Sequence, residues 1–130
     1  MYSVMVLDNS EVELVAIQKA LEKDYNVIAM NNAKQTLARL NKANIMPDLL
    51  IMDLMLQGVS GLQVLTRLMT ADKTKSIRVI IISGDKDAST EIEAYRIGAA
   101  DFVKKPLNMQ ILKKRVEMQT EFLENKKQIR

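Results

Sequence analysis

The sequence contains no cysteine and no histidine. Without cysteine there is no disulfide framework and no thiolate metal site. Without histidine there are no imidazole metal ligands, and the commonest general base in enzymes is also missing. Any chemistry that this chain performs must therefore use carboxylates, hydroxyls and lysines.

Long hydrophobic runs are missing as well. A membrane-spanning helix needs roughly 20 consecutive apolar residues, and the N-terminus lacks the charged and hydrophobic regions of a signal peptide. The chain has 130 residues, of which 48% are apolar. That is enough to bury a core in one domain without a metal or a disulfide. We expect a single soluble, cytoplasmic domain with no membrane association.

The positive charge is concentrated near the C-terminus. The net charge is +3, but residues 1–103 carry a net charge of −2 and residues 104–130 carry +5. Lysines and arginines alternate with glutamates in the basic segment, which is typical of a solvated helix face. The rest of the chain has no strongly basic face. We therefore expect no direct nucleic-acid binding.

Five short apolar runs alternate with segments of helical periodicity. The runs predict strands at residues 4–7, 27–30, 49–52, 79–82 and 102–103. Apolar residues recur between them at helical spacing, in four sets: Val12, Val15 and Ala16; Ala33, Leu37 and Leu40; Leu62, Leu65, Leu68 and Met69; Ile92, Tyr95 and Ala99. This alternation indicates an α/β fold with a five-stranded parallel sheet that helices cover on both faces.

Residues that cap helices lie at the predicted helix boundaries. Ser10 and Glu13 form an S-x-x-E capping box before the first helix. Gly98 is placed to end the fourth helix, and Asn108 is placed to cap the fifth. The boundaries therefore agree with the predicted alternation of strands and helices.

Polar residues follow the apolar runs where a ligand is expected to bind. In parallel α/β sheets, ligands bind beyond the carboxyl ends of the strands. The residues at those ends are Asp8, Asn9, Asp53, Ser83, Lys104 and Lys105. We expect two carboxylates, an amide, a hydroxyl and an ammonium group to share this edge of the sheet.

These groups suit the transfer of a phosphoryl group to a carboxylate. An aspartate attacks phosphorus without needing a base to deprotonate it. Because both reactants are negative, Mg²⁺ held by oxygen ligands and a nearby lysine are needed to offset the charge. Each residue taken alone has a structural explanation, as a cap, a turn residue or a surface lysine. Their joint placement favours the functional interpretation.

Four stretches of the chain resemble response-regulator receiver domains of bacterial two-component signalling: VMVLDNS, PDLLIMDLMLQGVSGLQVL, VIIISGD and IGAADFVKKPL. The resemblance extends from about Val4 to Val116. It implies a flavodoxin-like (βα)5 fold with strand order 2-1-3-4-5. It also implies a phosphorelay domain that accepts phosphate from a histidine kinase, a phosphotransfer protein or a small phosphodonor, and that is not otherwise an enzyme.

The resemblance assigns roles to four residues by their positions. Asp53 matches the phosphoacceptor, and Ser83 matches the switch hydroxyl. Lys105, directly before Pro106, matches the lysine that pairs with the acceptor and then with phosphate. Phe102 matches the aromatic residue that turns inward when the switch hydroxyl engages phosphate.

The metal ligands implied by the resemblance are Asp8, Asn9, Asp53 and the backbone carbonyl of Met55. Receivers usually have a second acid where this chain has Asn9. The amide keeps an oxygen donor but removes a negative charge, so Mg²⁺ binding should weaken. Two interpretations stay open. Either the domain is still phosphorylated, with a weakened metal site, or it is a pseudo-receiver whose state is set by partner binding.

Two positions bear on how long phosphate stays attached. Met55 and Asp85 match the positions that flank the path of the hydrolytic water in this family. An apolar side chain and a carboxylate orient a water molecule poorly beside phosphate. We therefore expect slow self-dephosphorylation.

The resemblance also implies a signalling face made by the fourth helix, the fifth strand and the fifth helix, here residues 92–98, 100–104 and the segment after Leu107. Its partner would be a downstream target, an output domain or a second copy of the chain. We expect the receiver domain at residues 1–118. Residues 119–130 then either extend the last helix or begin a linker, and a possible apolar seam along this segment leaves both alternatives open.

Overall fold

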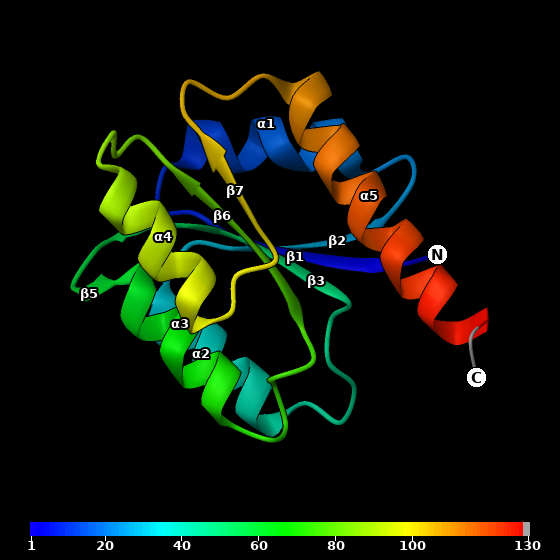
Figure 1. Ribbon diagram of the computed structural model, residues 1–130. Helices are drawn as coiled ribbons and strands as arrows, with labels where there is room; N and C mark the ends of the chain where they lie inside the picture. Colours follow the sequence, from blue (N-terminus) through cyan, green and yellow to red (C-terminus); the bar gives the residue numbers. More distant parts are fainter. Residues whose placement is uncertain (129–130) are drawn as a thin grey trace.

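A central parallel sheet lies between two layers of helices in the computed structural model, which describes residues 1–128 (Figure 1). The strands of this sheet are β1 (Ser3–Leu7), β2 (Asn26–Met30), β3 (Leu49–Asp53), β6 (Arg78–Ser83) and β7 (Asp101–Lys104). The helices are α1 (Glu11–Leu21), α2 (Ala33–Lys42), α3 (Gly61–Thr70), α4 (Ala88–Ile97) and α5 (Met109–Gln128). None of these helices has the length and hydropathy of a membrane span.

The strand order is β2-β1-β3-β6-β7, and all neighbouring strands pair in parallel. Counted within the sheet, this is the predicted order 2-1-3-4-5 of the flavodoxin-like fold. All five residues of β3 are buried, because helices cover both faces of the sheet. The five predicted strands and the fold class are therefore confirmed.

Two hydrophobic clusters hold the helices to opposite faces of the sheet. The first cluster contains buried side chains of α2, α3 and α4, among them Leu40, Leu65 and Ala94. The second contains side chains of α1 and α5, among them Ile17 and Leu112. The same division is visible in Figure 1, where α1 and α5 lie on the opposite side of the sheet from α2, α3 and α4.

The buried face of α1 differs from the predicted apolar set. Val12 is 84% exposed and Val15 is also exposed, whereas Leu14, Ile17 and Leu21 are buried against the sheet. The larger leucine and isoleucine side chains remove more apolar area from water than valine and alanine do. The helix was predicted, but its apolar face was assigned wrongly.

The predicted helix ends are confirmed at three places. Ser10 caps α1, with its Oγ accepting from the backbone N–H of Glu13 at 3.4 Å. Gly98 ends α4 at φ 136°, a conformation that favours glycine. Asn108 accepts the N–H of Gln110 at 2.9 Å, before the start of α5.

The capping box itself is only half formed. In a complete box, the carboxylate of Glu13 would accept the N–H of Ser10. That N–H instead donates to Asp8 Oδ1 at 2.9 Å. The prediction of a reciprocal box was therefore wrong, and the Glu13 side chain is left for other contacts.

A short hairpin that the sequence pattern did not predict follows β3. Strands β4 (Met55–Leu56) and β5 (Val59–Ser60) pair antiparallel, and Gly58 in the turn has φ 79°. At the start of α3, a Cβ on Gly61 would lie 2.7 Å from the backbone oxygen of Leu54. Glycine at this position lets the hairpin close tightly over the end of β3.

Helix α5 continues without a break past residue 118 to Gln128. Leu112 and Val116 are buried, and Leu123 packs against the same cluster. These three side chains face the core, whereas Met118, the fourth apolar residue of the possible seam, is 51% exposed. The predicted C-terminal extension covers residues 119–130, and its last two residues, 129–130, lie outside the described part of the chain.

Contacts also join the later turns of α5 to the amino ends of the strands. Arg78 Nε donates to Gln119 Oε1 at 3.0 Å, and its guanidinium lies 4.2 Å from the ring centroid of Phe122. The Tyr2 hydroxyl donates to Glu124. Figure 1 shows the N-terminus beside this end of α5.

Candidate functional site

Asp53 is the last residue of β3, at the carboxyl edge of the sheet. Its side chain is nearly buried and makes two contacts. Oδ1 accepts the backbone N–H of Met55 at 2.9 Å, and Oδ2 accepts from Lys105 Nζ at 2.7 Å. Lys105 directly follows β7, so the end of one strand is held to the end of another across the sheet.

Asp8 follows β1 and is 0% exposed. Its backbone N–H donates to the Met30 carbonyl at 3.1 Å, which continues the pairing of β1 with β2. Its Oδ1 accepts from Ser10 N, as described above. Within residues 1–128, Asp8 Oδ2 is buried and has no hydrogen-bond partner. A buried, unpaired carboxylate oxygen is costly unless a cation or a donor meets it.

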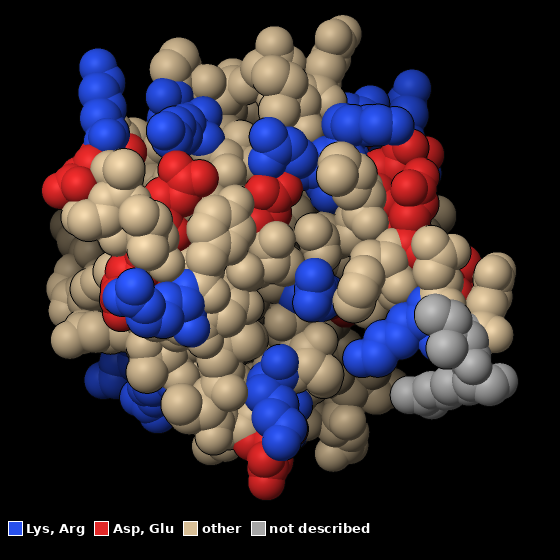
Figure 2. All heavy atoms as spheres, viewed as in Figure 1, with Lys and Arg blue, Asp and Glu red and all other residues tan. Residues whose placement is uncertain are grey.

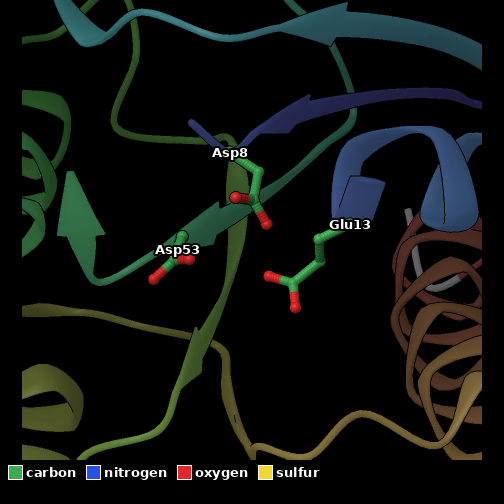
Figure 3. Close-up of side chains that lie close together, drawn as sticks. All are labelled: Asp8, Glu13 and Asp53. Atoms are coloured by element: carbon green, nitrogen blue, oxygen red, sulfur yellow. The ribbon is translucent and has the colours of Figure 1, made fainter. Parts of the chain in front are cut away.

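A third carboxylate, from Glu13 on α1, joins the two aspartates. One oxygen from each of Asp8, Glu13 and Asp53 lies within 4.8 Å of the others. Figure 3 shows the three carboxyl groups converging from β1, α1 and β3. Glu13 Oε1 also lies 2.8 Å from Lys105 Nζ, so these two groups form an ion pair. Lys105 therefore contacts two of the three carboxylates.

Glu13 was not predicted as a site residue. Its position three residues after Ser10 indicated a helix-capping role, and this role left no reason to expect a second one. The available signal was its place in the first turn of the helix that follows Asp8, which brings its side chain near the carboxyl edge of β1.

The crowding of these groups shifts their pKa values. Burial, and then the neighbouring Glu13 carboxyl, raises the pKa of Asp8 to about 7. Burial also acts on Glu13, but contacts with Asp8 and Lys105 outweigh it and lower the Glu13 pKa. For Lys105, burial opposes the charged form, and the two carboxylates overcome it and raise the pKa. The raised pKa values of Asp8 and Lys105 show that the cluster favours the protonated forms of these groups. A bound cation would be favoured for the same electrostatic reason.

The two adjacent lysines have different surroundings. Lys105 contacts Asp53 and Glu13, with its side chain only 25% exposed. Lys104 is exposed and lies 3.6 Å from Glu91 of α4. Of these two lysines, Lys105 therefore contacts the carboxylate cluster and Lys104 does not.

Asn9 and Met55 lie at the surface beside this cluster. Asn9 is exposed, although Asp8 immediately before it is completely buried. Met55 is 72% exposed, and its backbone N–H holds Asp53. The structure therefore brings the carboxylate of Glu13 into the cluster, while the amide of Asn9 faces solvent.

Ser83 lies on β6, the strand next to that of Asp53, and Phe102 lies on β7, one strand further along the sheet. Ser83 is buried and follows Ile82, the register partner of Asp53. Its Oγ accepts the N–H of Asp85 at 2.9 Å, so it serves the following turn. Phe102 is buried in the first hydrophobic cluster, on the face covered by α2, α3 and α4.

The donor set suits a hard divalent cation. Carboxylate oxygens are the ligands that Mg²⁺ and Mn²⁺ prefer. Within residues 1–128, Asp8 Oδ2 has no hydrogen-bond partner, and the Asp8 carboxyl group lies beside those of Glu13 and Asp53 (Figure 3). These three carboxylates outnumber the one ammonium group in the cluster. The residues present therefore fit a metal ion at this edge of the sheet.

Comparison with known proteins gives a family match over most of the chain. Residues 4–117 match the family model described as "Response regulator receiver domain". Protein PilH of Pseudomonas aeruginosa is 31% identical over 120 residues, covering 89% of this chain and 95% of that protein.

Other similar proteins are longer, or similar mainly in fold. A probable cyclic di-GMP phosphodiesterase of Vibrio cholerae is 27% identical over 114 residues, and this chain spans 25% of its length. The signal receiver domain of a putative Luxo repressor protein from Vibrio parahaemolyticus superposes with a TM-score of 0.88 at 21% identity, covering 98% of this chain and 96% of that chain. This last likeness shows the fold.

Proposed function

Because the chain belongs to the response regulator receiver domains, the phosphoacceptor domains of two-component signalling, we propose that Asp53 is the residue that accepts phosphate. The observation that carries the proposal is the 2.7 Å contact between Lys105 Nζ and Asp53 Oδ2. It is made beside a second buried carboxylate, at the edge of the sheet where α/β folds bind ligands.

In the proposed reaction, a carboxylate oxygen of Asp53 forms a bond to phosphorus. The bond from phosphorus to the donor breaks, and its electron pair leaves with the donor. The donor is a histidine kinase, a phosphotransfer protein or a small acyl phosphate. Lys105 offsets negative charge on the acceptor and then on the phosphoryl oxygens.

Ser83 and Phe102 form the proposed switch. The Ser83 hydroxyl is one residue beyond the register partner of Asp53, within the region that an attached phosphate would reach. To engage phosphate, the Ser83 hydroxyl would donate its O–H to a phosphoryl oxygen. The reorientation of this side chain alters its contact with the following turn and so changes the end of β6. Phe102 pairs in register with Ile81 of that strand, so it is placed to respond.

We propose that Mg²⁺ is the cofactor. Asp8, Asp53 and the backbone carbonyl of Met55 would hold it, with Asn9 a weak neutral donor at most. When bound, the ion neutralises negative charge that builds up during transfer. The fully buried Asp8, with its unpartnered Oδ2, supports a cation at this position.

The proposed output surface consists of α4, β7 and α5. Large apolar side chains are exposed on its two helices, among them Ile92, Tyr95 and Ile111. Figure 2 shows lysines and arginines interspersed with acidic side chains on the viewed face, which suits a protein partner better than nucleic acid. The partner would be a downstream target, an output domain or a second copy of this chain.

We place the receiver domain at residues 1–118 and treat the following residues as an extension of its last helix or the start of a linker. The unbroken course of α5 to Gln128 supports the extension. The chain spans a quarter or less of the length of the first two curated relatives that it matches.

The test is intact-mass analysis after incubation with acetyl phosphate over a Mg²⁺ series. We expect a phosphate-sized adduct that disappears in Asp53→Asn and that requires less Mg²⁺ in Asn9→Asp. No adduct at any Mg²⁺ concentration, with Asn9→Asp restoring one, would instead identify a pseudo-receiver that works through partner binding alone.

A further inference from the structure

The side chain of Glu13 occupies a position that its sequence context does not explain. As the third residue of α1, it is placed to accept the N–H of its own N-cap residue, Ser10. Asp8 accepts that N–H instead. The Glu13 carboxylate turns toward the end of β3 and lies 2.8 Å from Lys105 Nζ. Its orientation is therefore determined by the carboxylate cluster and not by the cap.

Glu13 also supplies the charge that position 9 lacks. With an amide at Asn9, Asp8 and Asp53 together with Lys105 leave a formal charge of −1 at the site. The Glu13 carboxylate brings it to −2, the charge that matches a divalent cation. It comes from the first turn of α1 and is only partly exposed, whereas Asn9 is exposed.

A separate observation indicates a ligand at this cluster. Asp8 is 0% exposed, and within the described residues its Oδ2 is buried without a hydrogen-bond partner. The carboxyl group that carries this oxygen is one of three, with those of Glu13 and Asp53, that each place one oxygen within 4.8 Å of the others. Lys105 contacts the other two carboxylates only.

We propose that Glu13 is the second acidic ligand of the divalent cation, in place of the carboxylate that is absent at position 9. The inference rests on the proposed function, whose metal site it completes. It changes one expectation from the sequence: the amide at position 9 does not by itself leave a weak site. Binding the cation also draws Glu13 away from Lys105, which frees the ammonium group for Asp53 and its phosphoryl group.

The test is direct Mn²⁺ binding without any phosphodonor, measured by electron paramagnetic resonance of free Mn²⁺ and by calorimetry. Glu13→Gln keeps the size of the side chain and removes its charge. We expect it to weaken Mn²⁺ binding at least about tenfold. The matched control is Glu11→Gln, an exposed glutamate in the same helical turn, which should change the affinity less than about twofold.

A rescue variant separates a metal ligand from a merely structural residue. In Asn9→Asp combined with Glu13→Gln, the carboxylate is moved back to position 9, and Mn²⁺ affinity should return to within about threefold of the native protein. Circular dichroism and thermal melting establish that each variant is folded. If Glu13→Gln does not fold by itself, the Mn²⁺ affinity of the double variant is compared with that of Asn9→Asp. The difference between these two affinities then measures the contribution of Glu13.

The outcomes keep this inference apart from the proposed function. Unchanged or tighter Mn²⁺ binding in folded Glu13→Gln would overturn it, even if Asp53 is phosphorylated. The absence of Mn²⁺ binding in the native protein would overturn it too. Loss of affinity in Glu13→Gln with rescue by Asn9→Asp would support it, even if acetyl phosphate leaves no adduct on Asp53.

Discussion

Lys105 holds Asp53 through a 2.7 Å contact between Nζ and Oδ2, which joins the segment after β7 to the end of β3. The same ammonium group lies 2.8 Å from Glu13 Oε1. One lysine therefore balances two carboxylates from different parts of the fold. A third carboxylate, Asp8, is buried beside them.

Replacing Lys105 should destabilise the metal-free protein. In Lys105→Met, the carboxylates of Asp53 and Glu13 lose the cation that both contact, while the aliphatic part of the side chain remains. Because the Lys105 side chain is a quarter exposed, we expect the free energy of unfolding to fall by about 1–3 kcal/mol, less than for a fully buried pair. Urea denaturation in the presence of EDTA measures it.

The control for that experiment is Lys104→Met. Its ion pair with Glu91 spans 3.6 Å between an exposed lysine and a partly exposed glutamate, so the free energy of unfolding should change by less than about 0.5 kcal/mol. Equal effects of the two substitutions would show that Lys105 contributes no more than a surface lysine.

Replacing Asp8 should have the opposite effect on stability. In Asp8→Asn, Oδ1 can still accept the N–H of Ser10, while the new amide N–H₂ stands near the Glu13 and Asp53 carboxylates. Removing a buried like charge should raise the free energy of unfolding of the metal-free protein by about 1–2 kcal/mol. Urea denaturation with EDTA measures this as well.

The added stability should be accompanied by weaker Mn²⁺ binding, since one proposed ligand loses its charge. Asp72→Asn is the control, because that side chain is 96% exposed and its loss should alter stability by less than about 0.5 kcal/mol. A destabilised Asp8→Asn protein would show that the carboxylate is fully satisfied without a cation.

Phosphate on Asp53 should be long-lived. Both oxygens of Asp85 accept hydrogen bonds, Oδ1 from Asp87 N in the same loop and Oδ2 from Thr90 Oγ1 in α4, each at 2.9 Å. Met55 offers only an exposed thioether side chain. Neither side chain is free to orient a hydrolytic water molecule, so the adduct should persist for minutes or longer after the phosphodonor is removed.

Met55→Asn tests this explanation by adding a group that binds water. It should shorten the lifetime roughly 3–10-fold, less than the roughly 100-fold or more that a general base contributes, because an amide orients a water molecule without taking its proton. Met118→Asn, at an exposed position on α5, should not change the lifetime. A native half-life of seconds, followed by mass spectrometry, would contradict the prediction.

Removing the end of α5 should destabilise the domain. A chain that ends at residue 118 loses the Gln119 and Phe122 contacts with Arg78 and the packing of Leu123. We expect the free energy of unfolding to fall by about 2–3 kcal/mol, the sum of one hydrogen bond, one cation–π contact and one partly buried leucine.

A chain that ends at residue 125 keeps these contacts and serves as the control; its stability should stay within about 0.5 kcal/mol of the native value. If the chain ending at residue 118 is as stable as the native protein, the residues after 118 add nothing to the domain and the linker alternative is favoured. Thermal melting compares the three chains.

Much of the fold follows from the sequence because its causes are local. Apolar runs too short for buried helices identified all five strands of the sheet, and the residues at their ends placed Asp53 and Asp8 at one edge. Ser10, Gly98 and Asn108 identified helix ends, because a cap is formed by backbone groups a few residues away. The resemblance to receivers then indicated which residue at each strand end to examine.

Other features were decided only by tertiary structure, because they depend on partners distant in the sequence. The face that α1 buries depends on the sheet beneath it, so Val12 remains exposed while Ile17 is buried. Glu13 satisfies the local rule for a capping box, yet its carboxylate is turned toward Lys105, a residue near the other end of the chain. The partly buried ion pair with Lys105 is more favourable for Glu13 than the capping contact, because Asp8 already accepts the N–H of Ser10. A local sequence pattern cannot show this, because Lys105 is distant in the sequence.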